Sequence, residues 1–195
     1  MKATDPDRHD ARVYTRPFAR LLAGLPAHPI IVEVGTAYAV SSENQASCGM
    51  STLAWVEFVQ RHGGEVHSID IALDHLAVCR ATIALELGTT DCLACHGGDG
   101  ELVVQRLVKA LPRIDLLYID GGTGGDKAAA QLRAALPALR RGAGFVGFDD
   151  CASGDPAQNL NPEVRVSEVY RDPTAFDLEH VWTDGICMCY RVHQP

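Results

Sequence analysis

The sequence has few aromatic residues, no long apolar run and no surplus of basic charge. Aromatic residues make up 6% of the 195 positions, so aliphatic side chains must supply most of the core. No stretch approaches the roughly 20 continuous apolar residues of a membrane-spanning helix, and residues 1–12 lack the apolar run of a signal peptide. We therefore expect a cytoplasmic protein. With 17 Lys and Arg against 25 Asp and Glu, the net charge of -8 disfavours nucleic acid and favours a small-molecule partner.

The seven cysteines are an odd number, which is typical of free thiols in a reducing compartment. Cys92, Cys95 and His96 have the C-x-x-C-H spacing that occurs in haem attachment, in redox pairs and in halves of zinc sites. The apolar pattern predicts a strand over residues 92–95, and side chains three positions apart on a strand point to opposite faces. We therefore expect the sheet to separate the two thiols, and packing of small residues rather than a cofactor.

Short β-rich apolar runs alternate with helix-periodic segments, which predicts an α/β protein with a Rossmann-like, doubly wound, mostly parallel seven-stranded sheet. Parallel strands are expected at residues 30–34, 66–70, 92–95, 114–120 and 144–148, with helices between them. The pair Asp184 and Gly185 between two apolar runs predicts an antiparallel carboxyl-terminal hairpin. One domain is expected over residues 1–195, with a helical extension in 1–28 and the Rossmann-like core in 29–195.

Acidic residues stand at or just after the successive predicted strands. In an open parallel sheet, ligands bind beyond the carboxyl ends of the strands. Any single acid there is equally well explained as a helix cap. A run of six favours a ligand site, and its members are Glu33, Asp70, Asp99, Asp120, Asp149 and Asp150.

Several motifs in chain order resemble one enzyme family. They are "VEVGT", "GMSTLAW", "HSIDI", "DLLYIDGG" and "LPALRRGAGFVGFDD", and they span about residues 30–150. The chain resembles class I S-adenosylmethionine-dependent methyltransferases, specifically the small-molecule O-methyltransferase group with macrocin-type and cephalosporin-hydroxylase-like members. This resemblance implies transfer of a methyl group from S-adenosylmethionine to a hydroxyl of a small molecule.

The resemblance also implies which residues bind the cofactor. It assigns Glu33, Gly35 and Thr36 to the first cofactor-binding turn and Ser51 to the start of the following helix. It assigns Asp70 to the ribose hydroxyls, which suit the two oxygens of a carboxylate. The remaining cofactor-binding residues that it implies are Gly98 and Asp99 near the adenine amino group, and Asp120.

A divalent cation is the second ligand that the resemblance implies. Asp120, Asp149 and Asp150 match acidic or amide groups that bind a metal in related O-methyltransferases, and they would be the catalytic residues. Three convergent carboxylates repel one another unless a cation joins them, and ligation by oxygen alone suits Mg²⁺. The alternative is that Asp149 or Asp150 caps the following loop and no metal binds.

The sequence departs from the family pattern at two places. Residues 36–48 are an insertion after the first turn, which is either a lid over the site or a surface loop. After Asp120, Gly121 and Gly122 precede Thr123 where related sequences often carry an acid and a histidine. The general base is therefore left open, with Lys127, His96 and His180 as unmatched candidates.

Two rival functions share this architecture. An NAD-dependent oxidoreductase is disfavoured because the turn after Gly35 lacks the G-x-G-x-x-G pattern. A protein that binds S-adenosylmethionine without catalysis is the other alternative. The identity of the acceptor and the existence of a homo-oligomer both stay open at this point.

Overall fold

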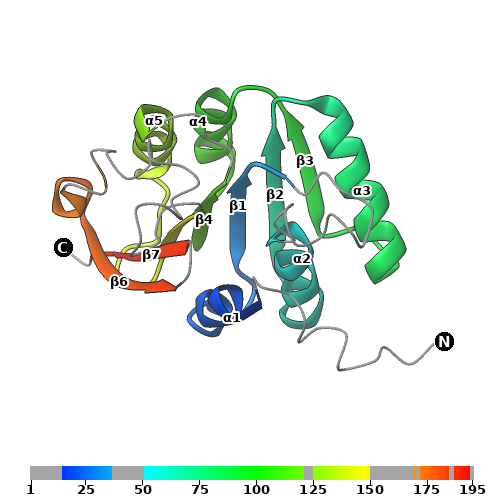
Figure 1. The fold of residues 1–195 in the computed structure, drawn as a ribbon, viewed down its shortest axis with the longest axis horizontal. Helices are drawn as coiled ribbons and strands as arrows, with labels where there is room; N and C mark the ends of the chain where they lie inside the picture. Colours follow the sequence, from blue (N-terminus) through cyan, green and yellow to red (C-terminus); the bar gives the residue numbers. More distant parts are fainter. Residues whose placement is uncertain are drawn as a thin grey trace, which may run out of the picture.

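The computed structural model describes residues 15–36, 51–120, 125–149, 169, 172–184 and 187–193. Helices and strands alternate along most of this length, as the apolar periodicity predicts (Figure 1). The helices are α1 (Thr15–Ala23), α2 (Ser51–His62), α3 (Leu73–Leu87), α4 (Gly100–Ala110), α5 (Gly125–Ala135) and the 3-10 helix η3 (Pro173–Phe176). The strands are β1 (Ile30–Val34), β2 (Glu65–Asp70), β3 (Leu93–Gly97), β4 (Leu116–Ile119), β5 (Phe145–Phe148), β6 (Leu178–Asp184) and β7 (Cys187–Val192).

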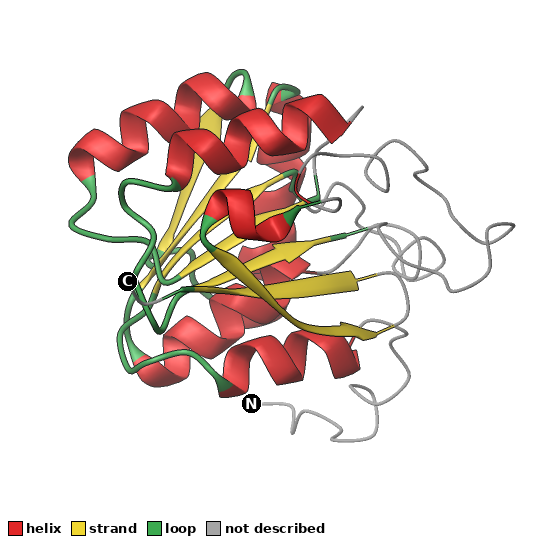
Figure 2. Ribbon diagram, turned by 90° about the vertical axis from the view of Figure 1, so that its left-hand side faces the viewer, coloured by secondary structure: helices red, strands yellow, loops and turns green. Residues whose placement is uncertain are grey.

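The strands of the described residues form one seven-stranded sheet in the order β3-β2-β1-β4-β5-β7-β6. Strands β1 to β5 pair in parallel, whereas β7 pairs antiparallel with both β5 and β6. Helices cover both faces of this sheet (Figure 2). The prediction of a Rossmann-like doubly wound sheet with an antiparallel carboxyl-terminal hairpin is confirmed.

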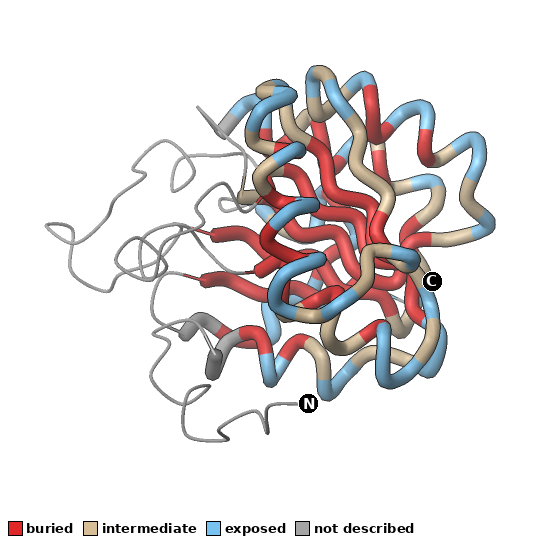
Figure 3. The backbone as a smooth tube through the Cα atoms, turned by 90° about the vertical axis from the view of Figure 1, so that its right-hand side faces the viewer, coloured by how far each residue is buried: buried red, intermediate tan, exposed pale blue. Residues whose placement is uncertain are grey.

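The sheet separates two apolar clusters, because successive side chains of a strand point to opposite faces. On β4, Leu117 and Ile119 join the cluster beneath α4 and α5. Leu116 and Tyr118 join the cluster that also contains side chains of α1, α2 and α3. The central strands are buried on both faces (Figure 3), which explains why β1 and β4 are apolar runs that only Glu33 of β1 interrupts.

Helix α1 lies within the region predicted as an extension, and it packs directly on the core. The ring of Phe18 meets those of Trp55 and Tyr118 edge to face, with centroids 4.9 and 5.7 Å apart. Leu21 is buried in the same cluster. No helix in the described part of the chain is long and apolar enough to cross a membrane.

The third strand differs from the prediction in a way that changes the placement of its cysteines. Strand β3 begins at Leu93 and ends at Gly97, so Cys92 precedes the strand and His96 lies within it. Cys92 and Cys95 both pack against the cluster of α1, α2 and α3. The prediction that the sheet separates these two thiols is therefore wrong, because the alternation of faces applies only inside the strand.

Candidate functional site

The carboxyl ends of β1, β2, β4 and β5 form one edge of the sheet, and the pairing of these strands is in register there. The residues at this edge are Gly35, Asp70, Asp120 and Asp149. The backbone amides of Gly35, Asp120 and Asp149 still donate to the neighbouring strand, at 2.8 to 3.0 Å. Because adjacent strands lie about 4.8 Å apart, the structure brings Asp120 and Asp149 side by side.

Glu33 is fully buried on β1, on the face that α2 covers. Its carboxylate accepts four side-chain hydrogen bonds, from Ser51 and Thr52 at 2.5 Å, Trp55 at 2.9 Å and Ser68 at 3.1 Å. Burial raises the pKa of Glu33 to about 7, and these four donors oppose the rise. Through these bonds, Glu33 attaches the start of α2 to the central strands.

The first turn begins at Gly35, whose φ of 92° lies in the region that favours glycine. Thr36 follows with a buried side chain, and its hydroxyl oxygen lies at hydrogen-bond distance from that of Ser68, 2.9 Å away. Ser68 also bonds Glu33, so one side chain of β2 contacts both of these predicted site residues. Ser51, a further predicted residue, bonds Glu33 as well. The structure therefore brings Glu33, Thr36 and Ser51 together.

Asp70 ends β2 with a carboxylate that is only partly exposed. Its Oδ1 accepts from the amide of Ala72 at 2.8 Å, and its Oδ2 lies 3.4 Å from Nδ1 of His75. A carboxylate has about four acceptor sites, so this one keeps capacity for a ligand. The next residue, Ile71, is 76% exposed, so its apolar side chain faces solvent next to this strand end. Sequence reasoning missed Ile71, although its place directly after Asp70 was the available signal.

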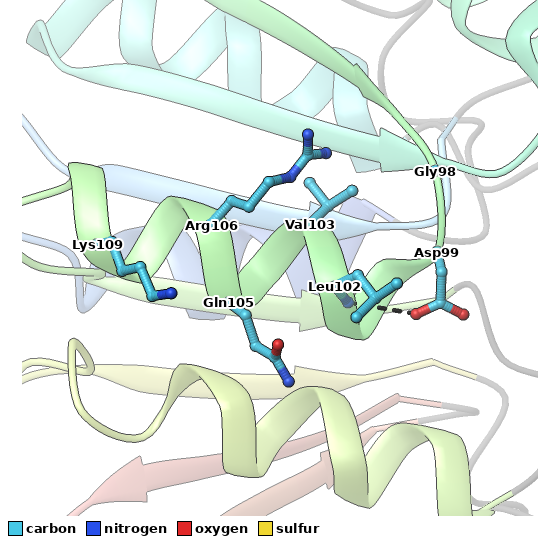
Figure 4. A pocket seen from close by; sticks show the side chains of 7 residues that line it. All are labelled: Gly98, Asp99, Leu102, Val103, Gln105, Arg106 and Lys109. Carbon is cyan, nitrogen blue, oxygen red and sulfur yellow. Dashed lines mark hydrogen bonds between the residues drawn. The ribbon is translucent and has the colours of Figure 1, made fainter.

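Asp99 is the N-cap of α4. Its Oδ1 accepts from the amides of Glu101 at 3.0 Å and Leu102 at 3.3 Å. Gly98, with a φ of 136°, donates from its amide to the carbonyl of Asp70 at 3.0 Å, which ties this loop to β2. A surface cavity of about 410 Å³ begins at Gly98 and Asp99 and extends along α4 to Lys109 (Figure 4). Helix capping thus explains the position of Asp99. Both capping hydrogen bonds, from Glu101 and Leu102, are accepted by the same carboxylate oxygen, Oδ1.

Asp149 is buried, and a chain of hydrogen bonds leads to it from the core. The thiol of Cys187 donates to Oδ1 of Asp149 at 3.3 Å. Because this thiol donates its proton to Asp149, the hydroxyl of Tyr118, 3.4 Å away, donates to the sulfur. Burial raises the pKa of Tyr118 well above its ordinary value, and the charges of Asp149 and Asp120 contribute. Tyr118 therefore stays protonated near neutral pH. Cys187 was not among the site residues predicted from the sequence.

The described residues contain no group of three or more His, Cys, Asp or Glu side chains that could hold a metal. Asp150, the third predicted metal ligand, lies outside the described residues. Most of the insertion at residues 36–48 lies outside them too, as do residues 121–123 after Asp120. Asp120 and Asp149 supply two carboxylates from adjacent strands, a donor type that suits Mg²⁺.

The three candidate bases lie on three different elements. His96 points to the α4 side of the sheet, where its Nε2 lies 3.0 Å from Nδ1 of His67. Burial lowers the pKa of His96, and the nearby His67 and Arg106 lower it further, so the imidazole is neutral at pH 7. His180 lies on the edge strand β6, and Lys127 is exposed on α5.

Comparison with known proteins gives a family and a fold. A family model described as a methyltransferase domain matches residues 46–151, which is more than half of the chain. Among curated proteins, no sequence matches.

Solved structures resemble the chain over most of its length. CalS11, a TDP-rhamnose 3'-O-methyltransferase of calicheamicin biosynthesis, superposes with a TM-score of 0.62 at 16% identity, covering 90% of this chain and 76% of that one. TomG, an O-methyltransferase of tomaymycin synthesis from Streptomyces achromogenes, was solved with S-adenosylmethionine. It gives a TM-score of 0.62 at 15% identity, covering 90% of this chain and 77% of TomG. MycE of the mycinamycin pathway was solved with Mg, S-adenosylhomocysteine and mycinamycin VI. It gives a TM-score of 0.59 at 15% identity, covering 91% of this chain and 48% of MycE. At these identities the likeness concerns the fold.

Proposed function

The chain belongs to the family of methyltransferase domains, and on this premise we propose that it transfers the methyl group of S-adenosylmethionine to a hydroxyl of a small molecule, with Mg²⁺ as a second cofactor. One observation carries the proposal. Gly35, Asp70, Asp120 and Asp149 meet at a single edge of the sheet, where the strand order reverses between β1 and β4. Open α/β sheets bind their ligands at such a switch point.

The residues at this edge fit S-adenosylmethionine. At Gly35 the backbone has a positive φ and no side chain, which permits close approach of a ligand. The carboxylate of Asp70 keeps acceptor capacity that suits two ribose hydroxyls. Beside it, the exposed side chain of Ile71 offers an apolar surface to a planar ring. Glu33 would act indirectly, because its carboxylate is enclosed by four donors and fixes the turn and the start of α2.

The carboxylates of Asp120 and Asp149 would hold Mg²⁺, with Asp150 as the third proposed ligand. When bound, the cation would supply positive charge that favours the ionised form of an acceptor hydroxyl. Asp149 is held in place by the thiol of Cys187, which restricts the position of its carboxylate. Tyr118 keeps its proton and therefore acts as a donor in this chain and not as a base.

When bound, S-adenosylmethionine supplies a methyl group on a positively charged sulfur. The chain's own contribution is to place the acceptor oxygen in line with that group and to exclude competing water. Acidic side chains at the same edge also favour a cation over an anion there. The names of two structural neighbours mention TDP-rhamnose and mycinamycin, which supports a small hydroxylated acceptor for this chain as well.

The direct test is methyl transfer from labelled S-adenosylmethionine to a panel of nucleotide sugars, glycosides and catechols. Each acceptor is assayed with Mg²⁺ and again with a chelator. We expect label on at least one acceptor, a loss of transfer with the chelator, and a loss in Asp120→Asn. Asp91→Asn is the matched control, because this exposed acid precedes β3 at the opposite edge of the sheet. Full activity in Asp120→Asn contradicts the metal role, and cofactor binding without transfer to any acceptor contradicts the catalytic role.

A further inference from the structure

The carboxylate of Asp70 is contacted by a histidine in the first turn of α3. Nδ1 of His75 lies 3.4 Å from Oδ2 of Asp70. The other carboxylate oxygen, Oδ1, accepts from the amide of Ala72 at 2.8 Å. The main chain of Asp70 is held as well, because its carbonyl accepts from the amide of Gly98 at 3.0 Å. Backbone amides therefore fix the main chain and one oxygen of this aspartate, while a side chain contacts the second oxygen.

The chemistry of this contact assigns a proton on the imidazole of His75. An ionised carboxylate only accepts hydrogen bonds, so the nitrogen that faces it carries a hydrogen. His75 therefore presents Nδ1–H to Asp70, both as the neutral imidazole and as the imidazolium. The side chain of His75 is 39% exposed and that of Asp70 only 12%. The carboxylate is thus largely shielded from water, and it depends on donors from the protein.

The orientation of the Asp70 carboxylate needs two donors. The last torsion of an aspartate joins an sp³ and an sp² carbon, and its energy minima are broad. One hydrogen bond, from Ala72 to Oδ1, leaves freedom of rotation about this torsion. A second donor at Oδ2 fixes the plane of the group. Recognition of two neighbouring hydroxyls by one carboxylate requires that plane to be held within about 10–20°.

On the basis of the proposed function, we propose that His75 is a positioning residue that fixes the plane of the Asp70 carboxylate and so sets how strongly the site distinguishes ribose from deoxyribose. His75 acts through Asp70 and needs no contact with the cofactor. Without the imidazole, Oδ2 loses its donor, the carboxylate turns more freely, and the ribose hydroxyls meet a less prepared acceptor. Contacts to the other parts of the cofactor do not depend on this torsion. The loss of affinity is therefore confined to ligands that carry the hydroxyl.

Calorimetry with ribose analogues tests the positioning role without an activity assay. The ligands are S-adenosylhomocysteine, which the proposed reaction leaves behind, and its 2′-deoxy and 3′-deoxy analogues. We expect the wild type to bind the parent ligand more tightly than at least one analogue. His75→Leu should weaken the parent by about fivefold, the effect of one hydrogen bond, and leave the affinity for that analogue nearly unchanged. The preference for ribose thus falls by about fivefold.

Two further variants separate the hydrogen bond from the shape of the side chain. In His75→Asn the amide nitrogen takes the approximate place of Nδ1, so this variant should keep most of the preference for ribose. His62→Leu is the matched control, because it makes the same substitution at an exposed histidine that stacks on Phe58. The carbonyl of His62 accepts from the amide of His28, which precedes β1, so this control lies at the opposite edge of the sheet. It should leave all affinities unchanged.

The possible failures are distinguishable. An equal loss of affinity for the parent and both analogues in His75→Leu would show a general effect on the site and overturn the proposal. Unchanged affinities in His75→Leu, or a wild type that binds all three ligands equally, would overturn it too. Loss of the preference in His75→Asn as well would refute Nδ1 as the donor. Absence of binding of any ligand to the folded wild type would contradict the proposed function itself.

Discussion

Replacing Glu33 with glutamine should remove a large part of the pH dependence of the protein's stability. Burial raises the pKa of this carboxyl from 4.5 to about 7 in the folded protein. One pKa unit corresponds to about 1.4 kcal/mol, so the complete shift amounts to about 3 kcal/mol. The folded protein holds this proton more tightly than the unfolded chain, and the contribution of Glu33 to stability is therefore greatest below pH 4.5, where the carboxyl is protonated in both states. It falls as the pH rises toward 7 and levels off above that value.

Glutamine preserves the shape of the side chain and most of its contacts. The amide oxygen can accept from Ser51 and Trp55, and the amide nitrogen can donate to the hydroxyls of Thr52 and Ser68, which rotate freely enough to accept. The variant is thus expected to fold, with no charge to bury at high pH.

Urea unfolding of both proteins at about pH 5 and about pH 8 measures the effect. The contributions of the other titrating groups cancel when the pH dependence of the variant is subtracted from that of the wild type. We expect the free energy of unfolding of the wild type to fall by about 2 to 3 kcal/mol more than that of Glu33→Gln over this interval. If the pH-dependent changes in the free energy of unfolding of the wild type and of Glu33→Gln agree within about 0.5 kcal/mol, the reasoning about the buried carboxyl is refuted.

Substitutions at three further residues separate binding from structure. Asp70→Asn keeps an acceptor for the amide of Ala72 and should lower the affinity for S-adenosylmethionine, measured by calorimetry, by about 10- to 100-fold. Unchanged affinity would remove Asp70 from the site. Asp99→Ser retains an N-cap oxygen, so thermal unfolding should change little while cofactor affinity falls; Asp99→Ala should in addition cost about 1 kcal/mol of stability. Cys187→Val leaves the buried hydroxyl of Tyr118 without its acceptor and should lower the free energy of unfolding by about 1 to 3 kcal/mol, and a smaller loss in Cys187→Ser would confirm the cause.

Most of the fold could be predicted because its strands are buried on both faces. Residues 116–119 are continuously apolar and residues 30–34 are interrupted only by Glu33, and the glycine or acidic residue that follows each run marks its end. The third strand was misplaced by one or two residues, since small and polar residues around Cys92 and His96 give no apolar boundary. Because β3 is an edge strand, it has a neighbouring strand on one side only, and its sequence lacks the apolar pattern that a second neighbour would impose.

The placement of acids at one edge also followed from the sequence, since parallel strands end together. The hydrogen-bond partners of each acid could not be predicted from the sequence. Glu33 takes its hydrogen bonds from Ser51, Thr52, Trp55 and Ser68, which lie 18 to 35 positions away along the chain, and only the folded structure brings them to the carboxylate. The match of the family model and the shared fold confirm the resemblance to S-adenosylmethionine-dependent methyltransferases. The roles of individual residues in the site stay predictions.

Calorimetric titration of S-adenosylmethionine into chelator-treated protein tests the central claim most directly, with NAD as the control ligand and a repeat in Mg²⁺. The account predicts saturable binding of the sulfonium cofactor at one site per chain, none of NAD, and weaker binding in Asp70→Asn. Folded protein that binds S-adenosylmethionine in neither condition would contradict the assignment of this edge of the sheet as a methyltransferase site.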